Sequence, residues 1–111
     1  MRTRPTRFYS NKQEKAVAKQ VDGKQQSNSG ATPFYKGDVT TDEFLIECKT
    51  TISTKASFSI KKEWLEKNRQ EALEMRKQCN ALCFDYGDGV RYYVIDERLF
   101  KRLVRYVEED N

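Results

Sequence analysis

The chain has 111 residues and carries 21 Lys and Arg against 17 Asp and Glu, with no histidine and 37% hydrophobic residues. This length fits one domain with a small core, and no apolar run approaches the roughly 20 residues of a membrane span. The basic start of the chain leads into no apolar segment, so we expect no signal peptide. Without histidine, Ser-His-Asp and Cys-His catalysis are excluded, and an enzyme would use carboxylates, lysine and a hard metal ion.

The cysteine count argues against a disulfide framework. Cys48, Cys79 and Cys83 form an odd set with no CxxC pair. A zinc site would call for more sulfur ligands or for histidine. We therefore expect three reduced, semi-buried thiols, as in a cytosolic protein.

Positive charge is concentrated at the amino-terminal side. Residues 1–36 hold eight Lys and Arg against two acidic residues, whereas residues 37–60 hold four acidic residues against two lysines. A basic region beside an acidic one suits a phosphate-binding surface around a cation site. A solvated basic tail would give the same count.

The first predicted element is a helix. Ser10–Gln13 matches an S-x-x-Q capping box, which predicts a helix from there to about Val21. Glu14 lies on the inward stripe of this helix, three and four residues before two apolar side chains. Burying an unpaired carboxylate is costly, so Glu14 is either functional or a stripe-edge residue paired with a lysine. A polar, glycine-containing loop is predicted over 22–32.

The rest of the chain alternates strands and helices. Hydrophobic patterning predicts strands over 34–39, 44–49, 57–60, 81–84 and 92–95, and helices over 61–78 and from Asp96 to about 107. The first two strands form a hairpin with its turn at 40–42, and Asp96 caps the last helix, whose apolar stripe is Leu99, Phe100, Leu103, Val104 and Val107. The order α-β-β-β-α-β-β-α predicts an α/β fold, a central mixed sheet flanked by helices, in one domain over 1–111.

One strand face combines acidic and basic side chains. In the strand 44–49, Glu47 and Lys49 point away from the apolar face that carries Ile46, because side chains alternate. The hairpin places Asp38 beside Glu47. One interpretation of this pattern is a solvated edge strand with an ion pair. The functional interpretation is an oxygen-ligand site of Asp38, Glu47 and the inward Glu14, which suits Mg²⁺ or Mn²⁺.

These residues resemble the motifs of a known family. Glu14 on a helix, then Gly37-Asp38, then Glu47-Cys48-Lys49 look like the motifs of the PD-(D/E)XK nuclease superfamily, and most closely those of small Holliday junction resolvases of the archaeal and phage type. The similarity covers the order of elements over 8–107, including a Ser/Gly loop at 27–30. Gly37 stands where the family has proline, and a second (D/E)-x-K match, Asp22–Lys24, lies in a polar loop with no strand to hold it.

The resemblance implies a restriction-endonuclease-like core and a Mg²⁺-dependent endodeoxyribonuclease, with Mn²⁺ as a substitute. Asp38 and Glu47 would hold the metal together with the backbone carbonyl of Cys48, and Glu14 would be a ligand or lie just behind the ligands. Lys49 would orient or deprotonate the attacking water, or donate to a phosphate oxygen. The catalytic set is then Glu14, Asp38, Glu47 and Lys49. No small-molecule cofactor is implied.

The resemblance also implies partners. Four-way DNA junctions would be cut at two places by a homodimer in the cytoplasm of a prokaryotic or phage-infected cell, with Tyr86, Tyr92 and Tyr106 as candidate interface residues or ordinary half-buried tyrosines. Residues 1–9 would be a basic arm on the phosphate backbone. The expected DNA contacts are Arg2, Arg4, Arg7, Lys12, Lys24, Ser29 and Lys36. The alternatives are another PD-(D/E)XK nuclease for repair or DNA degradation, and a non-enzymatic basic nucleic-acid-binding module.

Overall fold

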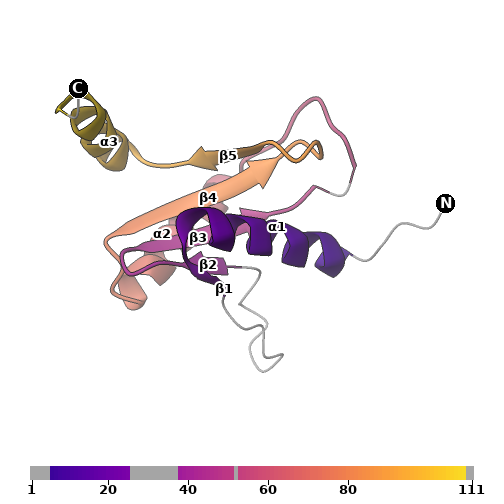
Figure 1. The fold of residues 1–111 in the computed structure, drawn as a ribbon, viewed down its shortest axis with the longest axis horizontal. Helices are drawn as coiled ribbons and strands as arrows, with labels where there is room; N and C mark the ends of the chain where they lie inside the picture. The colour runs from indigo at the N-terminus through magenta and orange to yellow at the C-terminus, as the bar shows by residue number, and fades with distance from the viewer. Residues whose placement is uncertain (1–5, 26–37, 52, 110–111) are drawn as a thin grey trace.

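The computed structural model describes residues 6–25, 38–51 and 53–109, with the backbone alone for residues 6–11. Five strands form one mixed sheet whose spatial order follows the chain (Figure 1). Strands β3 and β4 are parallel and joined through α2, and the other neighbouring pairs are antiparallel. The predicted α/β class is confirmed. The elements are α1 (Thr6–Val21), β1 (Lys24–Gln25), β2 (Asp38–Thr40), β3 (Phe44–Lys49), α2 (Lys62–Glu74), β4 (Cys79–Asp85), β5 (Arg91–Val94) and α3 (Glu97–Glu109).

Helices α1 and α2 cover opposite faces of the sheet. On the α1 face, Val17 packs with Val39, Ile46 and other small apolar side chains in a buried cluster. The other face is closed by α2, where Asn68 is buried and accepts a hydrogen bond of 2.8 Å from Asn80 Nδ2 of β4. The alternation predicted for β3 is confirmed, and it fixes which side chains meet which helix.

One predicted helix start, one predicted strand and part of one predicted loop are wrong. Helix α1 begins at Thr6, so Ser10 lies inside the helix and does not cap it. Residues 57–60 form no strand, because the ring of Phe58 stacks on Phe84 with centroids 4.9 Å apart and the segment pairs with no strand. The alternating pattern at 57–60 places the Phe58 ring against the sheet. Three strands still precede α2, because the structure has an additional strand, β1, within the loop predicted over 22–32. This strand pairs with β2.

Helix α3 lies at one end of the molecule, beyond the edge strand β5 and apart from α1 and α2 (Figure 1). Its predicted cap is confirmed: Asp96 Oδ1 accepts a hydrogen bond of 2.8 Å from the backbone N–H of Leu99. Leu99 is buried, whereas Phe100 and Leu103 on the same apolar stripe are exposed. Among the described residues, no helix is long and apolar enough to span a membrane.

Candidate active site

The β2–β3 hairpin brings the predicted acidic pair together. Asp38 lies directly opposite Glu47 in the antiparallel register. Such opposite residues point to the same face with Cβ atoms about 4.5–5.5 Å apart. Asp38 is 2% exposed and Glu47 7% exposed. Lys49 follows on the same face, and its Nζ lies 3.3 Å from Glu47 Oε2. Two buried carboxylates and one ammonium group therefore share the α2 side of the hairpin.

The Asp38 carboxyl is in an electrostatically unfavourable position. Burial, followed by the charges of Glu47, Glu71 and Glu14, raises the pKa of Asp38 to about 8, against the opposing charge of Lys49. Asp38 Oδ1 is buried and has no hydrogen-bond partner among the described residues. An unpaired buried carboxylate is costly, and a bound cation relieves that cost.

Glu14 lies on α1, which covers the sheet face opposite the one that carries Asp38 and Glu47. It is buried on the stripe of α1 that also carries Val17, as its spacing predicts. Its charge raises the pKa of Asp38. However, no three Asp, Glu or Cys side chains among the described residues gather closely enough to hold a metal ion as a set. The three-carboxylate ligand group expected from the sequence is therefore not assembled, and the structure presents the Asp38–Glu47 pair instead.

Glu71 was not identified from the sequence. It lies on α2, its charge acts on Asp38, and its own pKa is raised, mainly by burial. Lys67 Nζ lies 3.8 Å from Glu71 Oε1, an i,i+4 pair that makes the residue look like ordinary helix surface. A signal was present: Glu71 comes three residues after the buried Asn68, so helical spacing turns it towards the sheet.

The Lys49 ammonium group is held on two sides. Besides Glu47, its Nζ lies 4.3 Å from the centroid of the Trp64 ring, within cation–π distance. Lys61 Nζ lies over the same ring at 5.6 Å. The Lys49 side chain is still 23% exposed. It is therefore oriented by the protein and accessible to a substrate.

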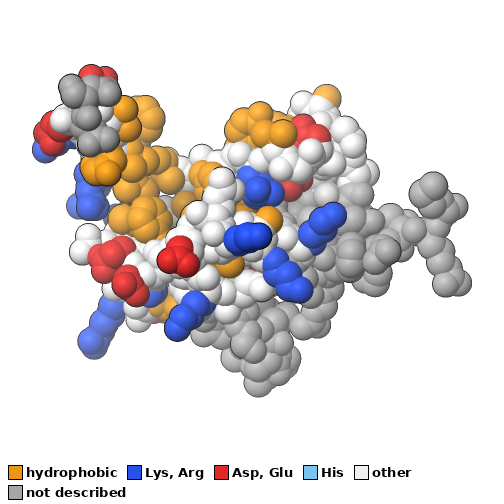
Figure 2. All heavy atoms as spheres, viewed as in Figure 1, with side chains coloured by type: hydrophobic (Ala, Val, Ile, Leu, Met, Phe, Trp, Pro, Cys, Tyr) orange, Lys and Arg blue, Asp and Glu red, His pale blue; other side chains and the backbone are white. Residues whose placement is uncertain are grey.

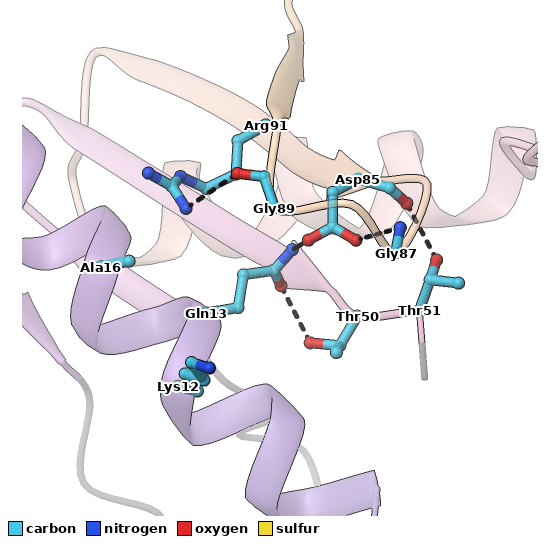
Figure 3. Close-up of a pocket in the computed structure, with 9 residues that line it drawn as sticks. All are labelled: Lys12, Gln13, Ala16, Thr50, Thr51, Asp85, Gly87, Gly89 and Arg91. Carbon is cyan, nitrogen blue, oxygen red and sulfur yellow. Dashed lines mark hydrogen bonds between the residues drawn. The ribbon is translucent and has the colours of Figure 1, made fainter. Parts of the chain in front are cut away.

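The backbone at the end of β3 is fixed from the other face by Gln13 (Figure 3). Gln13 is buried, and its Nε2 donates to the Lys49 carbonyl oxygen and to Asp85 Oδ2, both at 3.1 Å. Its Oε1 accepts a hydrogen bond of 2.9 Å from Thr50 Oγ1. As part of the predicted capping box, Gln13 had only a local role. In the fold it ties α1 to the strand end that carries Lys49.

This network borders an open cavity of about 260 Å³ (Figure 3). Lys12 and Arg91 line it, together with the Gly87–Gly89 turn. Gly87 has φ +91°, and a Cβ there would lie 2.6 Å from the carbonyl oxygen of Ser53, so glycine is required at this turn.

Two of the predicted DNA-contacting side chains are described. Lys12 and Lys24 are both exposed. For Arg7 only the backbone is described. Arg2, Arg4, Ser29 and Lys36 lie outside the described residues. The DNA contacts remain predictions.

The cysteines lie inside the fold. Cys48, Cys79 and Cys83 are free and are more deeply buried than the semi-buried thiols expected from the sequence, and their reduced state remains a prediction. A hydrogen bond with Cys83, together with burial, raises the pKa of Cys48, so this thiol stays protonated. The role of the Cys48 carbonyl as a metal ligand remains a prediction.

No protein-family model, curated protein or solved structure matches the chain. The nuclease resemblance therefore rests on the motifs alone, and a functional conclusion has to come from the residues of the site.

Proposed function

We propose that this chain is a Mg²⁺-dependent endodeoxyribonuclease of the PD-(D/E)XK type, with a restriction-endonuclease-like core, that resolves four-way DNA junctions. One observation carries the proposal: Asp38 Oδ1 is buried without a hydrogen-bond partner, opposite Glu47 and among further carboxylates. A solvated edge strand with an ion pair does not account for a buried, unpaired carboxyl oxygen.

The donor set fits Mg²⁺ or Mn²⁺. Mg²⁺ is commonly held by one or two carboxylates, with waters and substrate phosphates completing its octahedron, so Asp38 and Glu47 are sufficient as side-chain ligands. By the resemblance, the Cys48 carbonyl adds another oxygen. Glu14 and Glu71 add negative charge near the pair, which favours a dication. When bound, the metal lowers the pKa of a coordinated water and offsets charge on the reacting phosphate.

The reaction adds one water across a phosphodiester P–O bond. The water oxygen bonds to phosphorus, one ester oxygen leaves, and the proton lost by the water is balanced by the proton that the leaving oxygen takes up. Lys49 would orient or deprotonate the water, or donate to a phosphate oxygen, and the contacts of its ammonium group with Glu47 and Trp64 support this role. Gln13 holds the backbone carbonyl of the same residue.

The choice of substrate and assembly depends on the resemblance. A four-way junction has approximate two-fold symmetry, and paired cuts need two sites at a fixed spacing, which a C2 homodimer supplies. The basic arm and the exposed Lys12 and Lys24 would contact phosphates without reading sequence.

The test is cleavage of a labelled synthetic four-way junction, with a linear duplex of the same length in parallel. We expect Mg²⁺-dependent cutting of the junction, and a fall of about 10²–10⁴ in rate for Asp38→Asn, since a metal ligand and its charge are lost. Asp42→Asn is the matched control, because Asp42 is an exposed acid in the turn of the same hairpin, and its rate should stay within about twofold.

Each other outcome would change the conclusion. Equal rates for wild type and Asp38→Asn would discard the site. Equal cutting of the junction and the linear duplex would favour another nuclease of the superfamily. Absence of both cleavage and carboxylate-dependent Mn²⁺ binding would favour the non-enzymatic binding module.

A further inference from the structure

The polar cavity between α1 and the β4–β5 turn has a surplus of positive charge. Its volume is about 260 Å³, and two cationic side chains, Lys12 and Arg91, line it together with one carboxylate, Asp85. Figure 3 shows these side chains coming from α1, from β4 and from the start of β5. Figure 2 shows further Lys and Arg side chains over the part of the molecule where Figure 1 places α1. A cavity of this charge on a basic face suits an anion.

Asp85 does not neutralise Arg91, although the two residues lie directly opposite each other in β4 and β5. Residues in such a pair point to the same face of the sheet. However, Asp85 Oδ2 accepts a hydrogen bond of 3.1 Å from Gln13 Nε2, and its Oδ1 accepts one of 2.8 Å from the Gly87 N–H. Among the described residues, no carboxylate forms an ion pair with Arg91. The carboxylate opposite Arg91 is therefore held by neutral donors, and the guanidinium charge is left without a counter-charge.

The guanidinium group of Arg91 also lacks good acceptors. Its Nε is buried and has no hydrogen-bond partner within the described parts of the chain. Its Nη1 donates to the Gly89 carbonyl oxygen at 3.5 Å, and its Nη2 donates to Gln20 Oε1 at 3.3 Å. Both distances exceed the roughly 2.7–3.2 Å of an ordinary N–H···O bond. Because a buried donor without a partner is rare, and because only two long bonds hold this side chain, we expect its fork to turn towards an external acceptor.

The remaining polar side chains of the cavity satisfy one another. Thr50 Oγ1 donates to Gln13 Oε1 at 2.9 Å. Thr51 Oγ1 donates to the backbone carbonyl oxygen of Asp85, also at 2.9 Å. The side-chain donors left over in this cavity are therefore cationic: the Arg91 guanidinium and the ammonium group of the exposed lysine on α1. The matching ligand is a negatively charged group with several acceptor oxygens.

We propose that this cavity binds a phosphoryl group through Arg91 and Lys12. The planar guanidinium fork matches two phosphate oxygens, and the ammonium group adds a second positive charge. The cavity volume of about 260 Å³ lies below the roughly 300–1,000 Å³ of pockets that enclose a drug-sized molecule. The cavity therefore suits a single phosphoryl group, with the rest of a larger ligand extending into solvent.

Two sources could supply this group: the backbone of a DNA strand, and free phosphate or a phosphate monoester. Thr50 and Thr51 directly follow Lys49, so the cavity lies at the same end of β3 as the candidate active site, on the opposite face of the sheet. A DNA strand is the source that the proposed function supplies, and in this respect the inference rests on that function. Free phosphate carries the same chemistry and does not require it.

The first experiment is an NMR titration of the ¹⁵N-labelled full chain with sodium phosphate, followed at the Arg91 Nε–H and the Gly87 N–H. We expect both resonances to shift in a saturable way. Sodium acetate and sodium chloride at equal ionic strength should give no saturable shift, because neither offers the phosphate arrangement of oxygens. The same shifts with acetate as with phosphate would overturn a phosphoryl site.

Variants test which side chains hold the phosphate. Followed at Gly87, Arg91→Gln should weaken phosphate binding about tenfold or more, since charge-assisted hydrogen bonds are lost. Lys12→Gln should weaken it about threefold to tenfold, and it changes an exposed side chain, so it keeps the test decisive if Arg91→Gln does not fold. Arg98→Gln is the matched control, because it removes the same charge from an exposed position on α3, and it should bind as the wild type does. Circular dichroism would check that the variants are folded.

The second experiment separates the two sources. A short single-stranded oligothymidylate is added in chelator to the phosphate-bound chain. Displacement of phosphate at the Gly87 N–H identifies a DNA strand as the source. Phosphate that stays bound, with oligothymidylate shifts confined to other residues, identifies free phosphate or a monoester. A chain in which neither probe shifts these resonances, or in which Arg91→Gln and Lys12→Gln bind phosphate as the wild type does, overturns the site.

The outcomes also separate this proposal from the nuclease proposal. Saturable phosphate binding by a chain that cuts no DNA supports the phosphoryl site and removes the nuclease. Conversely, metal-dependent cleavage by a chain whose Arg91 and Gly87 resonances respond to neither probe overturns the phosphoryl site and leaves the nuclease in place.

Discussion

The β2–β3 hairpin and helix α3 depart from ordinary burial in opposite directions. The hairpin buries two carboxylates, Asp38 and Glu47, while α3 exposes Phe100 and Leu103. Charged groups are almost never fully buried unless paired, and contiguous apolar patches are seldom left exposed. Of the two departures, the one in the hairpin includes a buried oxygen without a hydrogen-bond partner among the described residues, and it points to a bound cation.

The two regions also differ in how firmly they are held. The hairpin is paired to β1 and β4 and fixed by hydrogen bonds from Gln13, whereas α3 is attached through Leu99. Substitutions in the hairpin should therefore change chemistry or folding, and substitutions on the exposed stripe of α3 should leave stability nearly unchanged.

The largest effect is expected at Lys49. If the charged groups of the hairpin had no chemical role, replacing Lys49 would leave the cleavage rate unchanged, and the contrast drawn between the hairpin and α3 would fail. Lys49→Met should lower the single-turnover rate of junction cleavage by about 10²–10⁴, because the group that positions the water or phosphate is lost. Lys61→Met is the control, since Lys61 lies over the same Trp64 ring but farther from it. Similar losses in both variants would show that the ring contact matters and the Glu47 contact does not.

The next effect is the pH dependence of stability without metal. The Asp38 pKa is about 8 in the folded protein and about 4 when unfolded, so the folded state binds more protons between these values. Stability should therefore fall as pH rises through this window, by at most about 1.4 kcal/mol per pH unit. Urea unfolding in chelator measures it.

Two comparisons complete this pH test. Asp38→Asn should flatten the dependence, because the titrating group is gone. Mg²⁺ should stabilise the wild type more above pH 8 than at pH 6, because Asp38 loses its proton only as the pH passes its pKa of about 8. A wild-type stability that is constant from pH 4 to pH 8 would contradict the placement of a charged cluster around Asp38.

The smallest expected effects are changes in unfolding free energy at one buried residue, Gln13, and one exposed residue, Leu103. Gln13→Leu should cost about 1–3 kcal/mol of unfolding free energy, because Asp85 Oδ2 and the Lys49 carbonyl lose their donor. It should also lower kcat more than KM, since Lys49 is displaced. Leu103→Asp, measured at a dilution where wild type is monomeric, should change stability by less than about 0.5 kcal/mol. Equal costs at the two positions would show that α3 packs within the core of its own chain.

The sequence predicted well the features that depend on neighbouring residues. The alternation of Phe44–Lys49, the pairing of Asp38 with Glu47 and the Asp96 cap follow from a two-residue period, a short turn and a local hydrogen bond. The same local reasoning failed at residues 57–60, where an alternating pattern serves ring packing on Phe84. Glu71 and Gln13 were missed because their roles depend on partners far away in the chain.

Sequence by itself determined which side chains share a strand face or a helix stripe, because periodicity is a property of the local backbone. Tertiary structure alone decided that Glu71 of α2 joins the charges that act on Asp38, and that the stripe of α3 remains exposed. Burial and electrostatic potential depend on which distant segments pack around a residue, and no short stretch of sequence contains that information.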